Sequence, residues 1–325
     1  MGSSGIHPFA WVLIACVLDR VIGDPRWCPH PVVLMGWWIA RLRGLAERWA
    51  QDDPARLRFA GVVITLLLVG GSSAAGWAVV ALAQQVPSGS VVQWAAQVLV
   101  VIALASALAG RSLEQAVQAV LAALQQGDLP LARERLGWIV GRDTDTLDAA
   151  EVLRALAETA SENAVDGLFA PLFWMLVGAC FAQPLAFAWG FKAISTLDSM
   201  LGYRHGRLRW LGTAGARLDD LLVWLPSRLV ALSLGQLHPA LRDGASDPSP
   251  NAGVSQAAYA HAVGVQLGGL NQYGAQQRRK PLLAAGCPAP NAASVLRMLE
   301  LSRRVQLLWL LLAAVLAAFI TKTLS

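Results

Sequence analysis

The chain has 325 residues, of which 55% are hydrophobic and only 14% are charged, with a net charge of +5. Soluble domains carry about 25% charged residues. Charged residues are scarce in this chain because it contains long apolar blocks. We therefore exclude a pair of soluble domains and predict a single membrane-embedded domain over residues 1–325. In a membrane protein a positive surplus marks cytoplasmic loops, so we expect no nucleic-acid partner.

The first apolar run, 6–22, is short for a membrane span and ends in a charged pair. It is followed by 23–31, Gly-Asp-Pro-Arg-Trp-Cys-Pro-His-Pro, in which three prolines stiffen the chain around Asp24 and His30. A lone histidine in such a connector is more often structural than functional. We nevertheless keep both side chains as candidates.

Two long uncharged runs, 59–83 and 91–109, predict secure spanning helices. The loop before the first run contains the arginines at positions 41, 43, 48, 56 and 58, whereas the connection 84–90 contains no charge. By the positive-inside rule the loop 23–58 is then cytoplasmic and the connection 84–90 lies outside. Segment 110–167 returns to the cytoplasm.

Two amphipathic helices of the soluble type follow, at 111–126 and 148–166. In the second helix Glu158, Glu162 and Asp166 recur at intervals of four, which places three carboxylates on one face. Such a face is also typical of a solvated helix. Here it runs directly into the apolar sequence GLFAPLFWMLVG, which favours a functional site at the membrane boundary.

The apolar run 168–191 is interrupted by Gln183-Pro184, and a second weak run, 221–235, contains Pro226. We interpret 168–235 as a broken or re-entrant pair of helices that returns to the cytoplasmic side. Segment 192–304 would then be cytoplasmic. The run 305–321 predicts the last span.

Polar residues gather where these broken helices end. The stretch 192–205 is rich in hydroxyl and charged side chains, and 217–220 reads Arg-Leu-Asp-Asp. Paired acids are often merely solvated, and arginines beside a span are often only a positive flank. Ionisable residues at membrane depth are nevertheless functional candidates by default. Further on, 247–253 predicts a rigid turn, and paired glycines in 262–274 allow close backbone approach.

The predicted fold is therefore an all-α, polytopic membrane protein. We expect about four full spans if 6–22 crosses, together with broken or re-entrant helices and cytoplasmic amphipathic helices. The loops 23–58, 110–167 and about 192–304 would carry the site.

Five short stretches of the chain resemble the CbiB/CobD family of cobalamin biosynthesis, in that family's order and over about residues 10–290. They are 18–36 (LDRVIGDPRWCPHPVVLMG), 141–174 (GRDT…AETASENAVDGLFAPLFW), 196–204 (TLDSMLGYR), 217–229 (RLDDLLVWLPSRL) and 249–274 (SPNAG…VQLGGLNQYG). Two positions depart from the family pattern: Ser195 stands where asparagine is common, and Asp247 where histidine is expected.

The resemblance implies an adenosylcobinamide-phosphate synthase, a ligase of the inner membrane whose catalytic loops face the cytoplasm. Such an enzyme joins (R)-1-aminopropan-2-ol or its O-phosphate to a propionate of adenosylcobyric acid, with ATP and Mg²⁺. The expected partners are these substrates and the lipid bilayer, with a homo-oligomer or contact with later membrane enzymes of the pathway as further possibilities.

Residue types and the resemblance together give candidate roles. For catalysis, including deprotonation of the amine, the candidates are Glu158, Glu162, Asp166 and Asp198. For the metal they are Asp24, Asp219 and Asp220. For phosphate or substrate they are His30, Arg142, Asn163, Lys192, Thr196, Arg204, Arg217 and Asn251.

Two other classes of membrane protein remain as alternatives. A transporter would place paired discontinuous helices at the bilayer midplane, often in inverted repeats, and the sequence shows no repeat. A membrane sensor of the AmpE type would share the architecture but would not need clustered acids and arginines.

Overall fold

The computed structural model describes residues 7–24, 30–273 and 276–324. Contacts divide the chain into two compact units, each described by itself. Unit 1 comprises Met1–Ala109, Ala170–Leu222 and Leu312–Ser325, and unit 2 comprises Gly110–Phe169 and Val223–Leu311. In the described part of the chain the secondary structure is helical apart from one two-stranded hairpin, which confirms the predicted all-α class.

The helices of unit 1 are α1 (Pro8–Ile22), α2 (Pro31–Ala50), α3 (Pro54–Gln85), α4 (Val91–Ala105), α8 (Ala170–Cys180), α9 (Pro184–Leu201), α10 (Leu208–Leu211) and the first part of α11 (Thr213–Ser233). Three of them begin with proline directly after a capping side chain. Asp53, for example, accepts hydrogen bonds from the backbone N–H groups of Ala55 and Arg56 at 2.8 and 3.1 Å. Proline at the first helical position and an acceptor before it together fix where these helices start.

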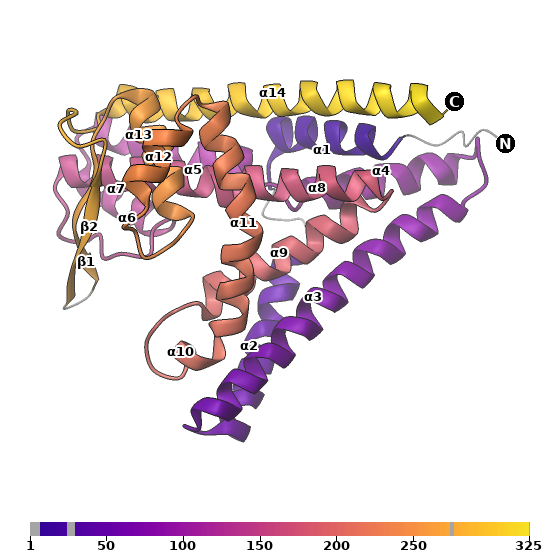
Figure 1. Ribbon diagram of the computed structural model, residues 1–325, viewed down its shortest axis with the longest axis horizontal. Helices are drawn as coiled ribbons and strands as arrows, with labels where there is room; N and C mark the ends of the chain where they lie inside the picture. The colour runs from indigo at the N-terminus through magenta and orange to yellow at the C-terminus, as the bar shows by residue number, and fades with distance from the viewer. Residues whose placement is uncertain (1–6, 25–29, 274–275, 325) are drawn as a thin grey trace. The chain divides into compact units, whose positions relative to one another are not determined.

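Helix α3 runs beside α9 and α2 in unit 1 (Figure 1). Small residues permit this close packing. A Cβ on Gly76 would come within 2.7 Å of the carbonyl oxygen of Leu185 in α9, and one on Gly61 within 2.1 Å of that of Leu211 in α10. Small residues that let backbones approach are typical of helix interfaces in membranes.

Unit 2 contains α5 (Gly110–Gln125), α6 (Leu129–Gly137), α7 (Ala149–Ala164), α12 (Leu237–Gly244), α13 (Ala252–Val263), strands β1 (Leu267–Tyr273) and β2 (Gln276–Leu283), the end of α11 and most of α14 (Ala292–Leu324). Helix α7 packs against α5, α6, α13 and β1, and α12 packs against α13 (Figure 1). The hairpin is antiparallel, with an irregularity between Leu267 and Gly269.

The sequence did not predict this hairpin. Strand β1 contains two glycines, which weaken a strand signal, and its apolar residues do not alternate. The expected close backbone approach is confirmed: Gly268 has φ +84°, and a Cβ there would lie 1.9 Å from the carbonyl oxygen of Pro281.

Within the residues that the structure describes, three helices are long and apolar enough to cross a membrane: α3, the continuous helix Ala149–Cys180, and Ala292–Phe319 within α14. The predicted spans 59–83 and 305–321 are thereby confirmed. Their exposed faces are apolar, as at Leu66 (68% exposed) and Leu311 (66%), which suits contact with lipid.

The prediction that 91–109 spans the membrane as one helix is wrong. Helix α4 has 15 residues, a length of about 22 Å, short of the roughly 30 Å hydrocarbon layer. It qualifies as a span only together with α5, from which it is bent by 44°. Helix α1, also of 15 residues, is not among the candidate spans.

The prediction that 148–166 forms a separate helix of the soluble type is also wrong. The helix begins as expected at the capping residue Asp148, but it continues through a π-helical turn, Val165–Phe169, into α8. The predicted interruption lies where α8 ends at Cys180 and α9 begins at Pro184. The apolar run therefore extends α7 instead of starting a new helix.

Candidate functional site

The carboxylate of Glu158 in α7 is the centre of a buried network in unit 2 and is only 2% exposed. It forms an ion pair with Arg142 and accepts a hydrogen bond from Arg154 at 3.2 Å. The backbone N–H of Gly268 in β1 donates a further bond at 3.0 Å. A carboxylate satisfied by two guanidinium groups and an amide fastens α7 to the hairpin and is poorly placed to act as a base.

Asn271 joins the same network from β1. Its side-chain oxygen accepts hydrogen bonds from Arg142 and, at 2.8 Å, from Arg154. Arg154 also donates to the carbonyl oxygens of Gly268 at 3.0 Å and Leu270 at 2.8 Å. Arg142, a candidate for phosphate, has a side chain that is only 7% exposed and engaged within unit 2, so the geometry favours a structural role for it.

One turn along α7 from Glu158 lies a second group, which we call the Glu162 cluster and define as Glu162, Asp247, Gln256 and Lys280. The side-chain NH₂ of Gln256 in α13 donates to Glu162 at 2.6 Å. The ammonium of Lys280 in β2 lies 3.7 Å from Oδ2 of Asp247. The charges of Lys280 and Asp247 both act on Glu162. With two carboxylates and one ammonium, the cluster has an excess of negative charge.

Asn163 and Asp166 follow Glu162 along the chain and are both half-buried. The π-helical turn begins at Val165, one residue before Asp166. The regular spacing that would stack Asp166 above Glu162 therefore ends just before it. Short π-helical turns inside α-helices are frequent at functional sites, so both residues stay candidates.

Asn251 precedes α13 and is 5% exposed. Its side-chain oxygen accepts a hydrogen bond from Arg228 at 2.7 Å, and Arg228 also donates to the carbonyl oxygen of Pro250 at 2.7 Å. Arg228, which was not among the predicted site residues, therefore holds the turn 247–253 against α11.

In unit 1, α9 and α11 bring together the acids Asp198, Asp219 and Asp220. Burial, and then the charges of Asp198 and Asp220, raise the pKa of Asp219 to about 8. Burial likewise raises the pKa of Asp220, while Arg217 and Arg204 oppose that effect. None of these residues lies in a candidate span. Close like charges of this kind favour either a bound proton or a bound cation.

The basic candidates of unit 1 differ in accessibility. Arg204 and Arg217 are exposed beside these acids, where charged hydrogen bonds to a phosphate are feasible. Lys192 is half-buried. Thr196 is 7% exposed and its hydroxyl donates to the carbonyl oxygen of Lys192 at 2.7 Å, so its hydrogen goes to the helix backbone.

His30 is the N-terminal capping residue of α2. Its Nδ1 accepts a hydrogen bond from the backbone N–H of Val32 at 3.3 Å, and its Nε2 lies 3.3 Å from Oδ1 of Asp24. The intervening residues 25–29 of the proline-rich motif lie outside the described residues.

The structure does not bring Asp24, Asp219 and Asp220 together as one set of metal ligands. Among the residues it describes, no three or more His, Cys, Asp or Glu side chains are grouped so that they could hold a metal ion. Magnesium, however, typically needs only one or two carboxylates beside substrate phosphates and water. The neighbouring Asp198 and Asp219, whose repulsion a cation would relieve, fit that smaller requirement.

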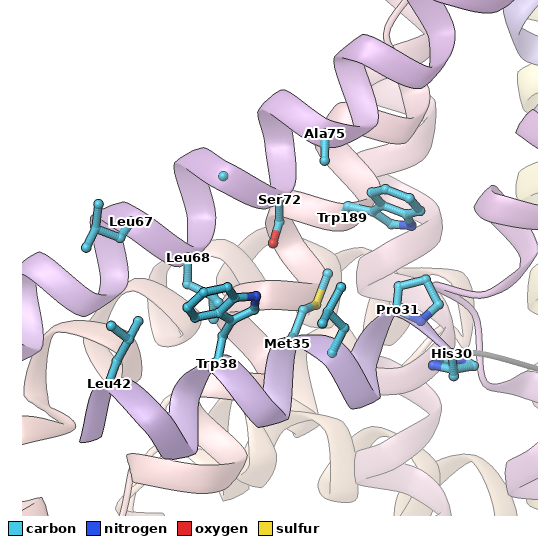
Figure 2. Close-up of a pocket in the computed structure, with 12 residues that line it drawn as sticks. His30, Pro31, Met35, Trp38, Leu42, Leu67, Leu68, Ser72, Ala75 and Trp189 are labelled. Atoms are coloured by element: carbon cyan, nitrogen blue, oxygen red, sulfur yellow. The ribbon is translucent and has the colours of Figure 1, made fainter. Parts of the chain in front are cut away.

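A cavity of about 680 Å³ lies in unit 1 between α2, α3 and α9. Figure 2 shows Met35 and Trp38 of α2 facing Leu68 and Ser72 of α3 across it, with Trp189 nearby. The lining is mainly apolar, so the cavity suits an alkyl group and not a phosphate.

The model of the family described as CobD/CbiB protein matches residues 12–302. The chain belongs to this family. It is 39% identical to the cobalamin biosynthesis protein CbiB of Salmonella choleraesuis and 40% identical to the protein CobD of Klebsiella pneumoniae, over 96% of each chain. It is 41% identical to CobD of Synechocystis over 94% of this chain and 92% of the relative. No solved structure matches it.

In this CobD/CbiB chain four polar residues of the network and the cluster were not among the predicted site residues: Arg154 of α7, and Gln256, Asn271 and Lys280, which the fold brings to α7. Gln256 had a detectable signal, because it is a polar residue within the apolar run of α13. Lys280 lies in a strand that was not predicted, and its partner Asp247 is 33 positions away in the sequence, so no local pattern marks the pair.

Proposed function

We propose that this CobD/CbiB-family protein acts in cobalamin biosynthesis as an adenosylcobinamide-phosphate synthase. It would form the amide between a propionate of adenosylcobyric acid and (R)-1-aminopropan-2-ol or its O-phosphate, with consumption of ATP. Family membership supports the pathway. The observation that carries the chemistry is the acid group of unit 1 beside two exposed arginines.

A carboxylate does not condense with an amine unaided, because its leaving group would be oxide or hydroxide. ATP-dependent activation needs side chains that bind phosphate and neutralise its charge. Arg204 and Arg217 are exposed and positively charged, which suits phosphate binding. Asp198 and Asp219 would hold Mg²⁺, which supplies charge neutralisation when bound. The apolar cavity of unit 1 offers space for alkyl groups of a substrate.

The decisive experiment incubates the purified protein with adenosylcobyric acid, aminopropanol O-phosphate and MgATP, and then searches for the condensed product by mass. Free aminopropanol in a parallel reaction distinguishes the two amine substrates. The product should appear with at least one amine and only when ATP is present. Uptake of corrinoid into vesicles without product would instead favour a transporter.

The same assay tests the acid group of unit 1. Asp198→Ala should lower the rate of amide formation at least 100-fold if Asp198 acts on the phosphates through Mg²⁺, an effect on the order of that seen when one electrostatic group is removed from an active site. Asp145→Asn is the matched control, because it removes an exposed acid that is distant from Asp198 in the sequence. Unchanged turnover in Asp198→Ala would remove Asp198 from the mechanism.

A further inference from the structure

The Glu162 cluster contains two buried acceptor atoms that have no hydrogen-bond donor in the described part of the chain. One is Oε1 of Gln256, a residue that is 1% exposed, and the other is Oδ2 of Asp247, whose side chain is 3% exposed. Lys280 lies 3.7 Å from Asp247, beyond hydrogen-bond distance. Buried polar atoms are paired in the great majority of cases, so two free acceptors in one cluster indicate a ligand that donates.

The orientation of the Gln256 amide follows from its neighbour. Its nitrogen donates to Oε2 of Glu162 at 2.6 Å. Rotating the amide by 180° would place its oxygen against a carboxylate oxygen, where neither atom can donate. The unpaired atom of Gln256 is therefore the carbonyl oxygen.

The cluster is partly exposed on one side. Glu162 is only half-buried, and the side chain of Lys280 is 24% exposed, whereas Gln256 and the Asp247 carboxylate lie deeper. The buried acceptors thus lie beneath a partly exposed rim.

The charges narrow the class of ligand. The cluster contains two carboxylates and one ammonium, so one further positive charge would neutralise it. A divalent cation is disfavoured by Lys280. A primary ammonium carries three N–H donors and one charge, which matches the Glu162 carboxylate, Oδ2 of Asp247 and Oε1 of Gln256.

We propose that the Glu162 cluster binds the primary ammonium group of the amino-alcohol substrate, with Glu162, Asp247 and Gln256 as its acceptors. The inference rests on the proposed function, which requires such an amine, and it assigns this task to residues of unit 2. Glu158, one turn earlier in α7, is not among the acceptors, because its carboxylate is already satisfied within the protein.

The test is a calorimetric titration of the full-length protein in nanodiscs with 1-aminopropan-2-ol, compared with propane-1,2-diol, which lacks the ammonium group. The wild-type protein should bind the amine and not the diol. Asp247→Asn and Glu162→Gln should each weaken binding about tenfold or more, because each removes a charged acceptor. Glu134→Gln, which removes an exposed acid of the same unit, should bind as the wild type does.

Binding requires no turnover, so the titration separates this inference from the proposed function. Equal affinity of Asp247→Asn and wild type, or equal binding of the diol, would overturn the inference even if the amide product forms. Conversely, selective amine binding in a protein that forms no product would support the inference and count against the synthase. If Glu162→Gln fails to fold by circular dichroism, Asp247→Asn decides the outcome.

Discussion

At Glu158 two guanidinium groups and a backbone amide converge on one buried carboxylate. Removing one partner of a buried ion pair leaves the other charge uncompensated, at a cost of about 3–5 kcal/mol. We therefore expect Glu158→Gln to lower the free energy of unfolding by roughly that amount. Denaturant titration in detergent measures it, with Asp145→Asn as a control that changes an exposed acid. A loss below about 0.5 kcal/mol, as for a surface substitution, would contradict the network.

The acids of unit 1 predict a dependence of stability on pH. Because burial and neighbouring charges raise the pKa of Asp219 from 3.8 to about 8, the folded protein binds this proton more tightly than the unfolded chain does. The stability that this bound proton contributes is fully present below about pH 4 and is lost as the pH rises toward 8. Asparagine cannot ionise, so Asp219→Asn should become progressively more stable than wild type between pH 5 and pH 8.5.

Thermal unfolding in the presence of a chelator, across that pH range, measures this difference in melting temperature. The chelator removes any divalent cation that would compete with the proton. Asp145→Asn should show a difference that does not change with pH. The same flat profile for Asp219→Asn would mean that Asp219 ionises normally in the folded protein.

At the scale of elements, the contact between α3 and α9 depends on Gly76, where a Cβ would lie 2.7 Å from the carbonyl oxygen of Leu185. Gly76→Ala should destabilise the protein by roughly 1–3 kcal/mol, because packed helices must separate to admit the methyl group. Gly70→Ala is the matched control: it lies in the same helix with nothing within 4 Å, and it should be neutral or stabilising by up to about 1 kcal/mol. Equal effects at both sites would show that helix propensity, and not packing, governs α3.

The continuity of α7 with α8 changes the interpretation of the carboxylate face. Periodicity alone treats 148–166 as a separate amphipathic helix, because its polar residues end where the apolar run begins. The π-helical turn at Val165–Phe169 joins the two without a break. Glu162 therefore lies in the same helix as the apolar run that ends at Cys180.

For the whole molecule, the distribution of arginines predicts that the loop 23–58 is cytoplasmic and the connection 84–90 is outside. Single cysteines introduced as Arg48→Cys and Ser88→Cys, both at exposed positions of a cysteine-free variant, test this orientation. In intact cells a membrane-impermeant maleimide should label position 88 and leave position 48 unlabelled until the membrane is opened. The reverse pattern would place the proposed site on the other side of the membrane.

The sequence by itself determined the membrane class, two of the spans, the interruption before Pro184 and the family. These follow from uncharged length, from proline chemistry and from short ordered motifs, all of which are local properties of the chain. It also marked Glu162, Asp198 and Asp219 as candidates, because carboxylates beside apolar runs are conspicuous.

Only the tertiary structure decided what each carboxylate contacts. Glu158 and Glu162 are one turn apart and look alike in the sequence. The first, however, is engaged by Arg142 and Gly268, whereas the second accepts a hydrogen bond from Gln256, in the cluster that contains the free acceptor atoms of Asp247 and Gln256. These partners lie from 16 to 110 residues away along the chain, as for Arg142 and Gly268 with Glu158. Hydrogen bonding and burial, which set the chemistry of a carboxylate, depend on that long-range packing and leave no trace in local spacing.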